Sequence, residues 1–153
     1  MSVDPKLAGN VIQILANIPD FLRRPILQRK LEEFYSMADD DKHETISLIL
    51  KAIALTEHTK LSVLTKTWMD VLSEFEGIKV TTMFRIYCEE LLRNPDYIKS
   101  LDIEFLMCAF SSLDDGQKEH LADCLKEAIL WFPKRTELLN MIPKPALKML
   151  NIQ

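Results

Sequence analysis

Three histidines and three cysteines supply most of the reactive side chains in this chain of 153 residues. A di-iron bundle uses Glu-x-x-His pairs on facing helices, but no glutamate stands three residues before His43, His58 or His120. His43-Glu44 also lacks the second histidine that a zinc-protease helix requires. The spacing therefore predicts surface histidines and no metal site.

The cysteines are Cys88, Cys108 and Cys124, an odd number with no Cys-x-x-Cys pair. All three lie within apolar helical stripes, and Cys108 belongs to the apolar run 105–110. Apolar burial raises the pKa of a thiol and makes it unreactive, whereas reactive cysteines lie in exposed, electropositive places. We expect reduced, buried and inert thiols in a reducing compartment.

Glycine and carboxylate patterns also argue against catalysis. The chain holds only Gly9, Gly77 and Gly116, so the Walker, Rossmann and Gly-x-Ser-x-Gly motifs are absent. The triplet 39–41 is Asp-Asp-Asp, without the spaced ligands and glycine of a calcium loop. We expect no catalytic residue, no cofactor and no metal, and hence a protein that is not an enzyme.

The net charge of −4 is unlike that of a typical nucleic-acid-binding domain, which carries a basic face. Basic residues gather twice, at Arg23, Arg24, Arg29 and Lys30 and at Lys134, Arg135, Lys144 and Lys148. Glu32 and Glu33 follow the first group at a spacing that permits pairing along a helix. Nucleic-acid binding is therefore not expected.

Apolar residues recur with helical spacing throughout the chain. One stripe has the i, i+3, i+4, i+7 pattern of a buried helical face, at Val80, Met83, Phe84, Tyr87, Cys88, Leu91 and Leu92. No stretch of comparable length alternates with period two, and the scarcity of glycine disfavours hairpin turns. The pattern predicts an all-α fold in one domain over residues 1–153.

Helix boundaries follow from caps and prolines. Asp114 with Gln117 fits a capping box, the Asp triplet at 39–41 fits a helix start, and Gly77 fits a C-terminal stop. Prolines, Pro25 included, fit joints between helices. We expect eight or nine antiparallel-packed helices, near 5–17, 20–35, 40–56, 60–76, 80–93, 96–111, 114–132, 134–141 and 144–151.

A shift of 75 residues lays 36–55 over 111–130 with seven identities, among them Asp39 on Asp114 and Leu50 on Leu125. This match predicts two stacked four-helix repeats, 5–77 and 79–152, in an α-solenoid-like or bundle arrangement. Two amphipathic helices with acidic caps would also resemble each other without duplication, so both interpretations stay open.

Aromatic and basic residues give the only hint of an interaction surface. Trp131 should lie at the edge of its helix because Phe132 continues the buried stripe. We expect an interaction surface that includes Trp131, Phe21, Arg23, Arg24, Lys134 and Arg135.

The favoured hypothesis is a non-catalytic helical binding or scaffold module that recognises a protein partner, or a second copy, through an apolar face. One alternative is a helical bundle with an apolar pocket for a small molecule or cofactor near Tyr87 and Cys88. The other is a nucleic-acid-associated regulator. Without a signal-peptide pattern or an apolar run of about 18 residues, we expect a soluble cytoplasmic protein with no membrane contact.

Overall fold

The computed structural model describes residues 5–101 and 103–151, with backbone alone for 5–8 and 100. Within these ranges the chain forms ten helices and no strand, which confirms the all-α prediction. The helices are α1 (Pro5–Asn17), α2 (Asp20–Tyr35), α3 (Asp39–Ala54), α4 (His58–Leu72), α5 (Gly77–Arg93), α6 (Asp96–Ser100), α7 (Ile103–Ser111), α8 (Asp115–Leu130), α9 (Arg135–Met141) and α10 (Lys144–Met149).

The helix expected over 96–111 is two helices, α6 and α7. Ile98 and Leu101 form one apolar stripe, and the stripe that begins at Ile103 is out of phase with it. One continuous helix could not turn both stripes toward the same interior. The backbone instead becomes extended at Leu101 (φ −74°, ψ 128°), whose side chain packs against the core.

Three predicted boundary signals have different outcomes. The capping box is confirmed, because the Gln117 backbone N–H donates to Asp114 Oδ1 at 2.8 Å and the Asp114 N–H to Gln117 Oε1 at 3.1 Å. Gly77 is not a helix stop: α4 ends at Leu72, no described glycine has positive φ, and Gly77 begins α5. Pro25 is not a joint either, because it lies inside α2, in the second turn of that helix.

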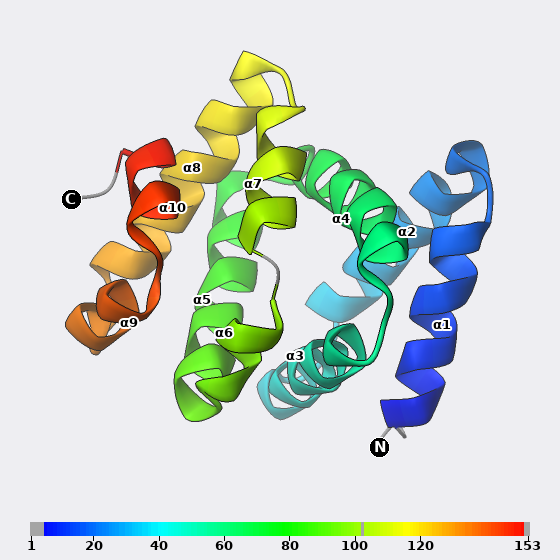
Figure 1. Ribbon diagram of the computed structural model, residues 1–153, viewed down its shortest axis with the longest axis horizontal. Coiled ribbons are helices and arrows are strands. Elements are labelled where there is room, and N and C mark those ends of the chain that lie inside the picture. The colour runs from blue at the N-terminus through cyan, green and yellow to red at the C-terminus, as the bar shows by residue number, and fades with distance from the viewer. Residues whose placement is uncertain (1–4, 102, 152–153) are drawn as a thin grey trace.

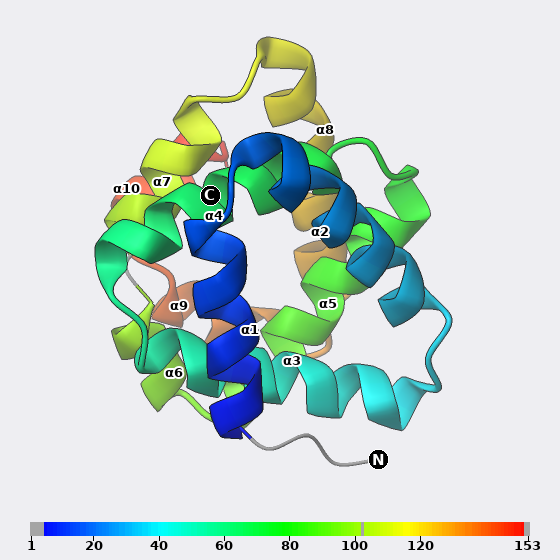
Figure 2. The same ribbon diagram turned by 90° about the vertical axis from the view of Figure 1, so that its right-hand side faces the viewer.

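The helices pack mainly against partners two or three places along the chain. The principal pairs are α5 with α8, α1 with α3, α2 with α4, and α4 with α7. Along the longest axis of the molecule, α1 and α2 lie at one end and α9 and α10 at the other (Figure 1). From the α1 end, α1 is seen to cross α3 and α4 (Figure 2).

The main core joins both halves of the chain around α3, α4 and α5. Its most deeply buried side chains include Ile46, Leu50, Leu72, Val80 and Met83. A smaller cluster of Cys88, Ile129, Phe132 and Leu138 joins α5 to α8 and α9. The internal repeat stays a prediction.

In the described part of the chain, none of the helices combines the length and the apolar character needed to cross a membrane.

Candidate functional site

A cavity of about 540 Å³ extends through the interior of the molecule. Side chains of α1 and α2 line one end, those of α3, α4 and α5 the middle, and those of α7, α9 and α10 the other end. The lining therefore comes from helices at both ends of the long axis, with α1 at one end and α10 at the other (Figure 1).

The lining of the cavity is almost entirely apolar. Apart from one tryptophan and one tyrosine, the polar residues among the described lining are Lys30, Glu33, Thr45 and Thr65. Lys30 and Glu33 are exposed on α2, so their charges lie at the edge of the cavity and not in its interior. A water molecule needs two to four polar partners to be held, and such a lining offers few.

Methionine is concentrated around the cavity. The chain has seven methionines, and every one after Met1 lines this space: Met37, Met69, Met83, Met107, Met141 and Met149. Methionine has three rotatable bonds and a polarizable sulfur, and it is over-used at surfaces that accommodate varied partners. The walls of the cavity can therefore adjust to the shape of an occupant.

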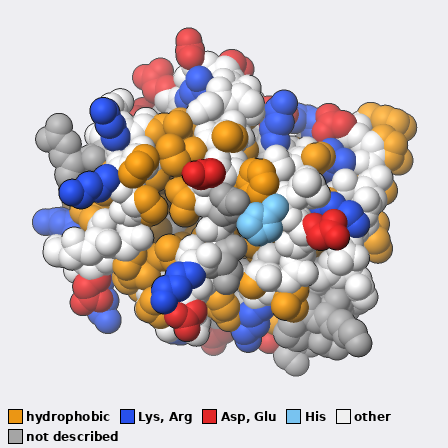
Figure 3. Space-filling model, viewed as in Figure 1, with side chains coloured by type: hydrophobic (Ala, Val, Ile, Leu, Met, Phe, Trp, Pro, Cys, Tyr) orange, Lys and Arg blue, Asp and Glu red, His pale blue; other side chains and the backbone are white. Residues whose placement is uncertain are grey.

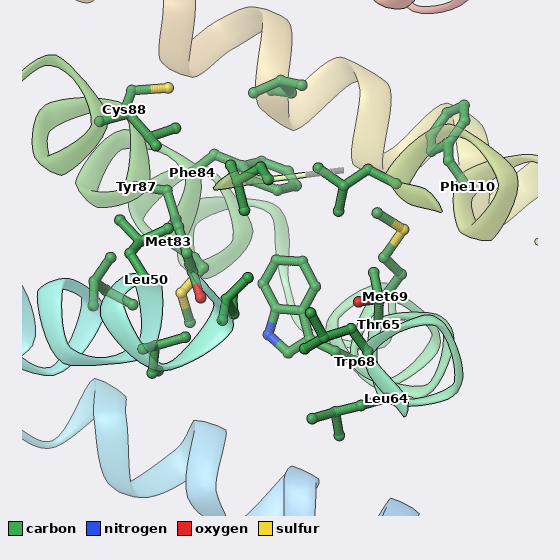
Figure 4. A pocket seen from close by; sticks show the side chains of 18 of the residues that line it. Leu50, Leu64, Thr65, Trp68, Met69, Met83, Phe84, Tyr87, Cys88 and Phe110 are labelled. Carbon is green, nitrogen blue, oxygen red and sulfur yellow. The ribbon is translucent and has the colours of Figure 1, made fainter. Parts of the chain in front are cut away.

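Two aromatic side chains bring polar atoms to the middle of the cavity. Trp68 lies one turn after Thr65 on α4, and Tyr87 lies opposite on α5 (Figure 4). The rings meet edge to face, with their centroids 5.7 Å apart and their planes at 64°. Within the described residues, the Trp68 indole N–H, the Tyr87 hydroxyl and the Thr65 hydroxyl make no hydrogen bond.

Burial keeps the groups beside the cavity uncharged. It raises the pKa of the Tyr87 hydroxyl well above its ordinary value of 10.0, so the phenol keeps its proton at neutral pH. Burial, with a smaller contribution from Glu89, raises the pKa of the Cys88 thiol from 9.0 to about 12. The described lining therefore offers neutral hydrogen-bond donors and no ionised group in the middle of the cavity.

The thiols differ from the sequence expectation at one position. Cys88 and Cys124 are buried as expected, and burial raises the pKa of Cys124 as well. Cys108 is exposed, because the apolar stripe of α7 follows Leu106, Met107 and Phe110 and leaves Cys108 on the other face.

Two of the three histidines are partly buried and contact polar groups of other helices or loops, whereas surface positions were expected for them. His43 of α3 lies 3.0 Å from Glu90 and 3.2 Å from Glu89 of α5, and His120 Nε2 lies 2.9 Å from the Phe75 carbonyl oxygen. Arg93 also pairs with Glu90, which is only 2% exposed.

Among the described residues, no group of three or more His, Cys, Asp or Glu side chains has an arrangement that would hold a metal ion.

The residues proposed from sequence as an interaction surface lie in two separate places. Trp131, Lys134 and Arg135 are exposed at the junction of α8 and α9, with Trp131 78% exposed. Phe21 is 73% exposed and belongs to α2, a helix on the opposite side of the molecule from α8 and α9 (Figure 1). They do not form one continuous surface.

The two arginines of that set have structural partners. Arg23 is 5% exposed, and its guanidinium donates to the carbonyl oxygens of Leu15 at 2.6 Å and Ile18 at 2.5 Å, at the end of α1. Arg24 forms ion pairs with Asp70 of α4 and with Glu74, which lies just after α4 ends. Arg23 consequently has little of its side chain available to a partner.

The sequence indicated part of the cavity but not its extent. Tyr87 and Cys88, named from sequence as the place for a pocket, both line it. Trp68 also lines the cavity, but its place in an apolar stripe indicated only a buried position, so its role there was missed. The abundance of methionine within the apolar stripes was the sequence feature that could have indicated how far the cavity extends.

In comparisons with known proteins, the chain matches no family model, no curated protein and no solved structure.

Proposed function

We propose that this protein is a binding protein that holds a small, largely apolar molecule in its interior cavity. The observation that carries the proposal is a 540 Å³ space with an almost wholly apolar lining. Small-molecule sites in proteins span about 300–1,000 Å³ and combine an apolar lining with a few polar groups that fix orientation. The Trp68 and Tyr87 pair supplies such groups.

Energetics favour a cavity that is filled. Apolar walls that face unfilled space lose packing contacts, and enclosed unfilled volume in protein cores costs about 24 cal/mol per Å³. Domains have a net stability of only about 5–15 kcal/mol. An apolar occupant would recover much of this cost, so ligand binding and stability should be strongly linked.

Titration with a neutral fluorophore, N-phenyl-1-naphthylamine, tests this function. We expect saturable 1:1 binding and a melting temperature raised by roughly 5–10 °C at 100 times Kd, since that excess adds about 2.7 kcal/mol. The Trp131→Phe variant leaves Trp68 as the single tryptophan, so a change in its emission on binding reports on the cavity itself.

Two results together would contradict the proposal: no saturable fluorescence change, and a melting temperature unaffected by any apolar compound. A useful control is Phe21→Ala, which removes an exposed aromatic ring that does not line the cavity. This variant should bind the fluorophore as the wild type does.

A second candidate function is self-association through the junction of α8 and α9. Leu130 and Trp131 are both exposed there, and exposed tryptophan is typical of interfaces. Light scattering should then show a dimer that a Trp131→Ser variant converts to monomer. A wild-type protein that stays monomeric up to millimolar concentration would rule this candidate out.

A further inference from the structure

The chemistry of the cavity restricts which apolar molecules it can hold. The middle of the space offers three neutral hydroxyl or N–H groups, on Thr65, Trp68 and Tyr87, and no described residue accepts or donates a hydrogen bond there. The indole N–H can only donate, and the two hydroxyls can donate or accept. A ligand oxygen at this position would meet donors that the protein itself leaves unpaired.

Charge complementarity excludes an ionised headgroup from the same position. Among the residues that the structure describes, no lysine or arginine lines the middle of the cavity, and Lys30, the one lysine in the described lining, lies exposed on α2 near Glu33. Burying a carboxylate without a cationic partner is far more costly than burying a neutral oxygen that is hydrogen-bonded.

From these observations, and on the premise of the proposed function, we infer that the ligand is an uncharged single-chain lipid with one carbonyl or hydroxyl oxygen. Its oxygen accepts hydrogen bonds from Trp68 Nε1 and Tyr87 Oη. The cavity is lined from α1 at one end of the molecule to α10 at the other, so its methionine-lined walls accommodate the chain on either side of that oxygen. Free fatty acids in their ionised form are selected against.

Tyr87 and Tyr35 form a matched pair for testing the hydrogen bond. The Tyr87 hydroxyl faces the cavity and has no hydrogen-bond partner among the described residues, whereas Tyr35, which does not line the cavity, donates from its hydroxyl to the Lys79 carbonyl oxygen at 2.6 Å. Tyr87→Phe should therefore weaken ligand binding and leave stability unchanged. Tyr35→Phe should lower stability and leave binding unchanged.

The experiment measures displacement of the neutral fluorophore by dodecane, dodecan-2-one and dodecanoate at pH 7.5, which share a twelve-carbon chain. We expect dodecan-2-one to bind about 3- to 10-fold more tightly than the other two, the range that one or two hydrogen bonds provide. Tyr87→Phe and Trp68→Phe should each remove most of that preference.

The outcomes separate this inference from the proposed function. If none of the three compounds displaces the fluorophore and the fluorophore itself does not bind, the proposed function fails. If dodecane and the ketone bind equally well and Tyr87→Phe changes neither, the cavity binds apolar molecules but the inference is overturned. It is also overturned if dodecanoate binds most tightly and loses its affinity in Lys30→Gln, which would place a charged headgroup at the α2 end.

Discussion

Individual polar side chains in this protein fall into two groups according to where their hydrogen bonds go. Arg23 and Glu90 are buried and have their donors and acceptors matched by the chain, through carbonyl oxygens for the first and through His43 and Arg93 for the second. Trp68 and Tyr87 are turned toward the cavity, and no described residue forms a hydrogen bond with the indole N–H or the phenol. The first group serves stability, and the second is available to a ligand.

Substitutions at the adjacent residues Arg23 and Arg24 measure how much the buried hydrogen bonds of Arg23 stabilise the fold. Replacing Arg23 with methionine keeps much of the volume but leaves the Leu15 and Ile18 carbonyl oxygens unpaired near the end of α1. We expect the free energy of unfolding in urea to fall by about 3 kcal/mol, at roughly 1–3 kcal/mol for each buried group left unmatched. Arg24→Met is the control, because partly exposed ion pairs contribute about 1 kcal/mol or less. Equal losses in the two variants would contradict this assignment.

The raised pKa of the Cys88 thiol predicts that the free energy of unfolding decreases at alkaline pH. Its pKa is raised to about 12 in the folded protein, whereas an unfolded chain loses the proton near 9.0. Between these values the folded state binds more protons than the unfolded state, so stability falls as pH rises from about 9 toward 12. Urea denaturation at pH 9, 10 and 11 should show this fall, and Cys88→Ala should make it shallower.

Cys108 provides the matched control for the buried thiol. It is exposed, so Cys108→Ala should leave the alkaline slope as in the wild type. It should also be the one thiol that N-ethylmaleimide modifies in the folded protein at pH 7, as counted by mass spectrometry. Rapid modification of Cys88 in the folded state would show that its burial is incomplete.

At the scale of elements, the sequence predicted the helices well and their joints less well. Apolar stripes with a period near 3.6 must be buried on one face, and this requirement alone located nearly every helix. Joints depend on weaker local energies: Pro25 was tolerated within α2, Gly77 began a helix, and the break between α6 and α7 arose from a phase shift between stripes. A helix start was predicted correctly where two side chains form a capping box, as Asp114 and Gln117 do at the start of α8.

The C-terminal helix α10 covers one end of the cavity. It has no buried residue of its own, yet Ala146, Met149 and Leu150 line the cavity from it or from its C-cap. Apolar side chains gather on the face of the molecule over α7 and α10 (Figure 3). The side chains of Ser111 on α7 and Met149 on α10 lie together, with Oγ and Sδ 3.9 Å apart. This arrangement makes α10 the element that we expect to move when a ligand enters.

Tethering α10 to α7 tests that expectation. In a Cys108→Ser background, cysteines placed by Ser111→Cys and Met149→Cys can be joined with a short bifunctional thiosulfonate reagent. We expect slower association and slower dissociation of the fluorophore in stopped-flow measurements, with Kd little changed because the closed state is the same. The Ser111→Cys variant treated with the same reagent is the control. Unchanged rates in the tethered protein would place the entrance elsewhere, such as the α2 end near Lys30 and Glu33.

At the scale of the whole molecule, the cavity arises from how the helices cross, and no single helix encodes it. A residue facing the cavity and a residue packed in the core have the same place in an apolar stripe. Leu64 and Leu72 of α4 illustrate this point: both continue one stripe, yet Leu72 is fully buried in the core and Leu64 lines the cavity. Period and composition therefore predicted the helices, while the space between them depended on crossing angles that one sequence does not specify.

This difference predicts opposite effects for the same substitution at two positions of α4. Leu72→Trp should destabilise the protein by about 1–3 kcal/mol, because a packed core has no room for the larger ring. Leu64→Trp should instead raise the melting temperature of the ligand-free protein by roughly 2–4 °C, since the indole can extend into the cavity and gain about 1 kcal/mol. The same variant should bind the fluorophore more weakly, because its ring takes space that the ligand needs. Stability gained at the expense of binding is the expected signature of a cavity kept open for a ligand. If Leu64→Trp destabilised the protein as much as Leu72→Trp, the space beside Leu64 would be closed in solution and the ligand-binding proposal would lose its physical basis.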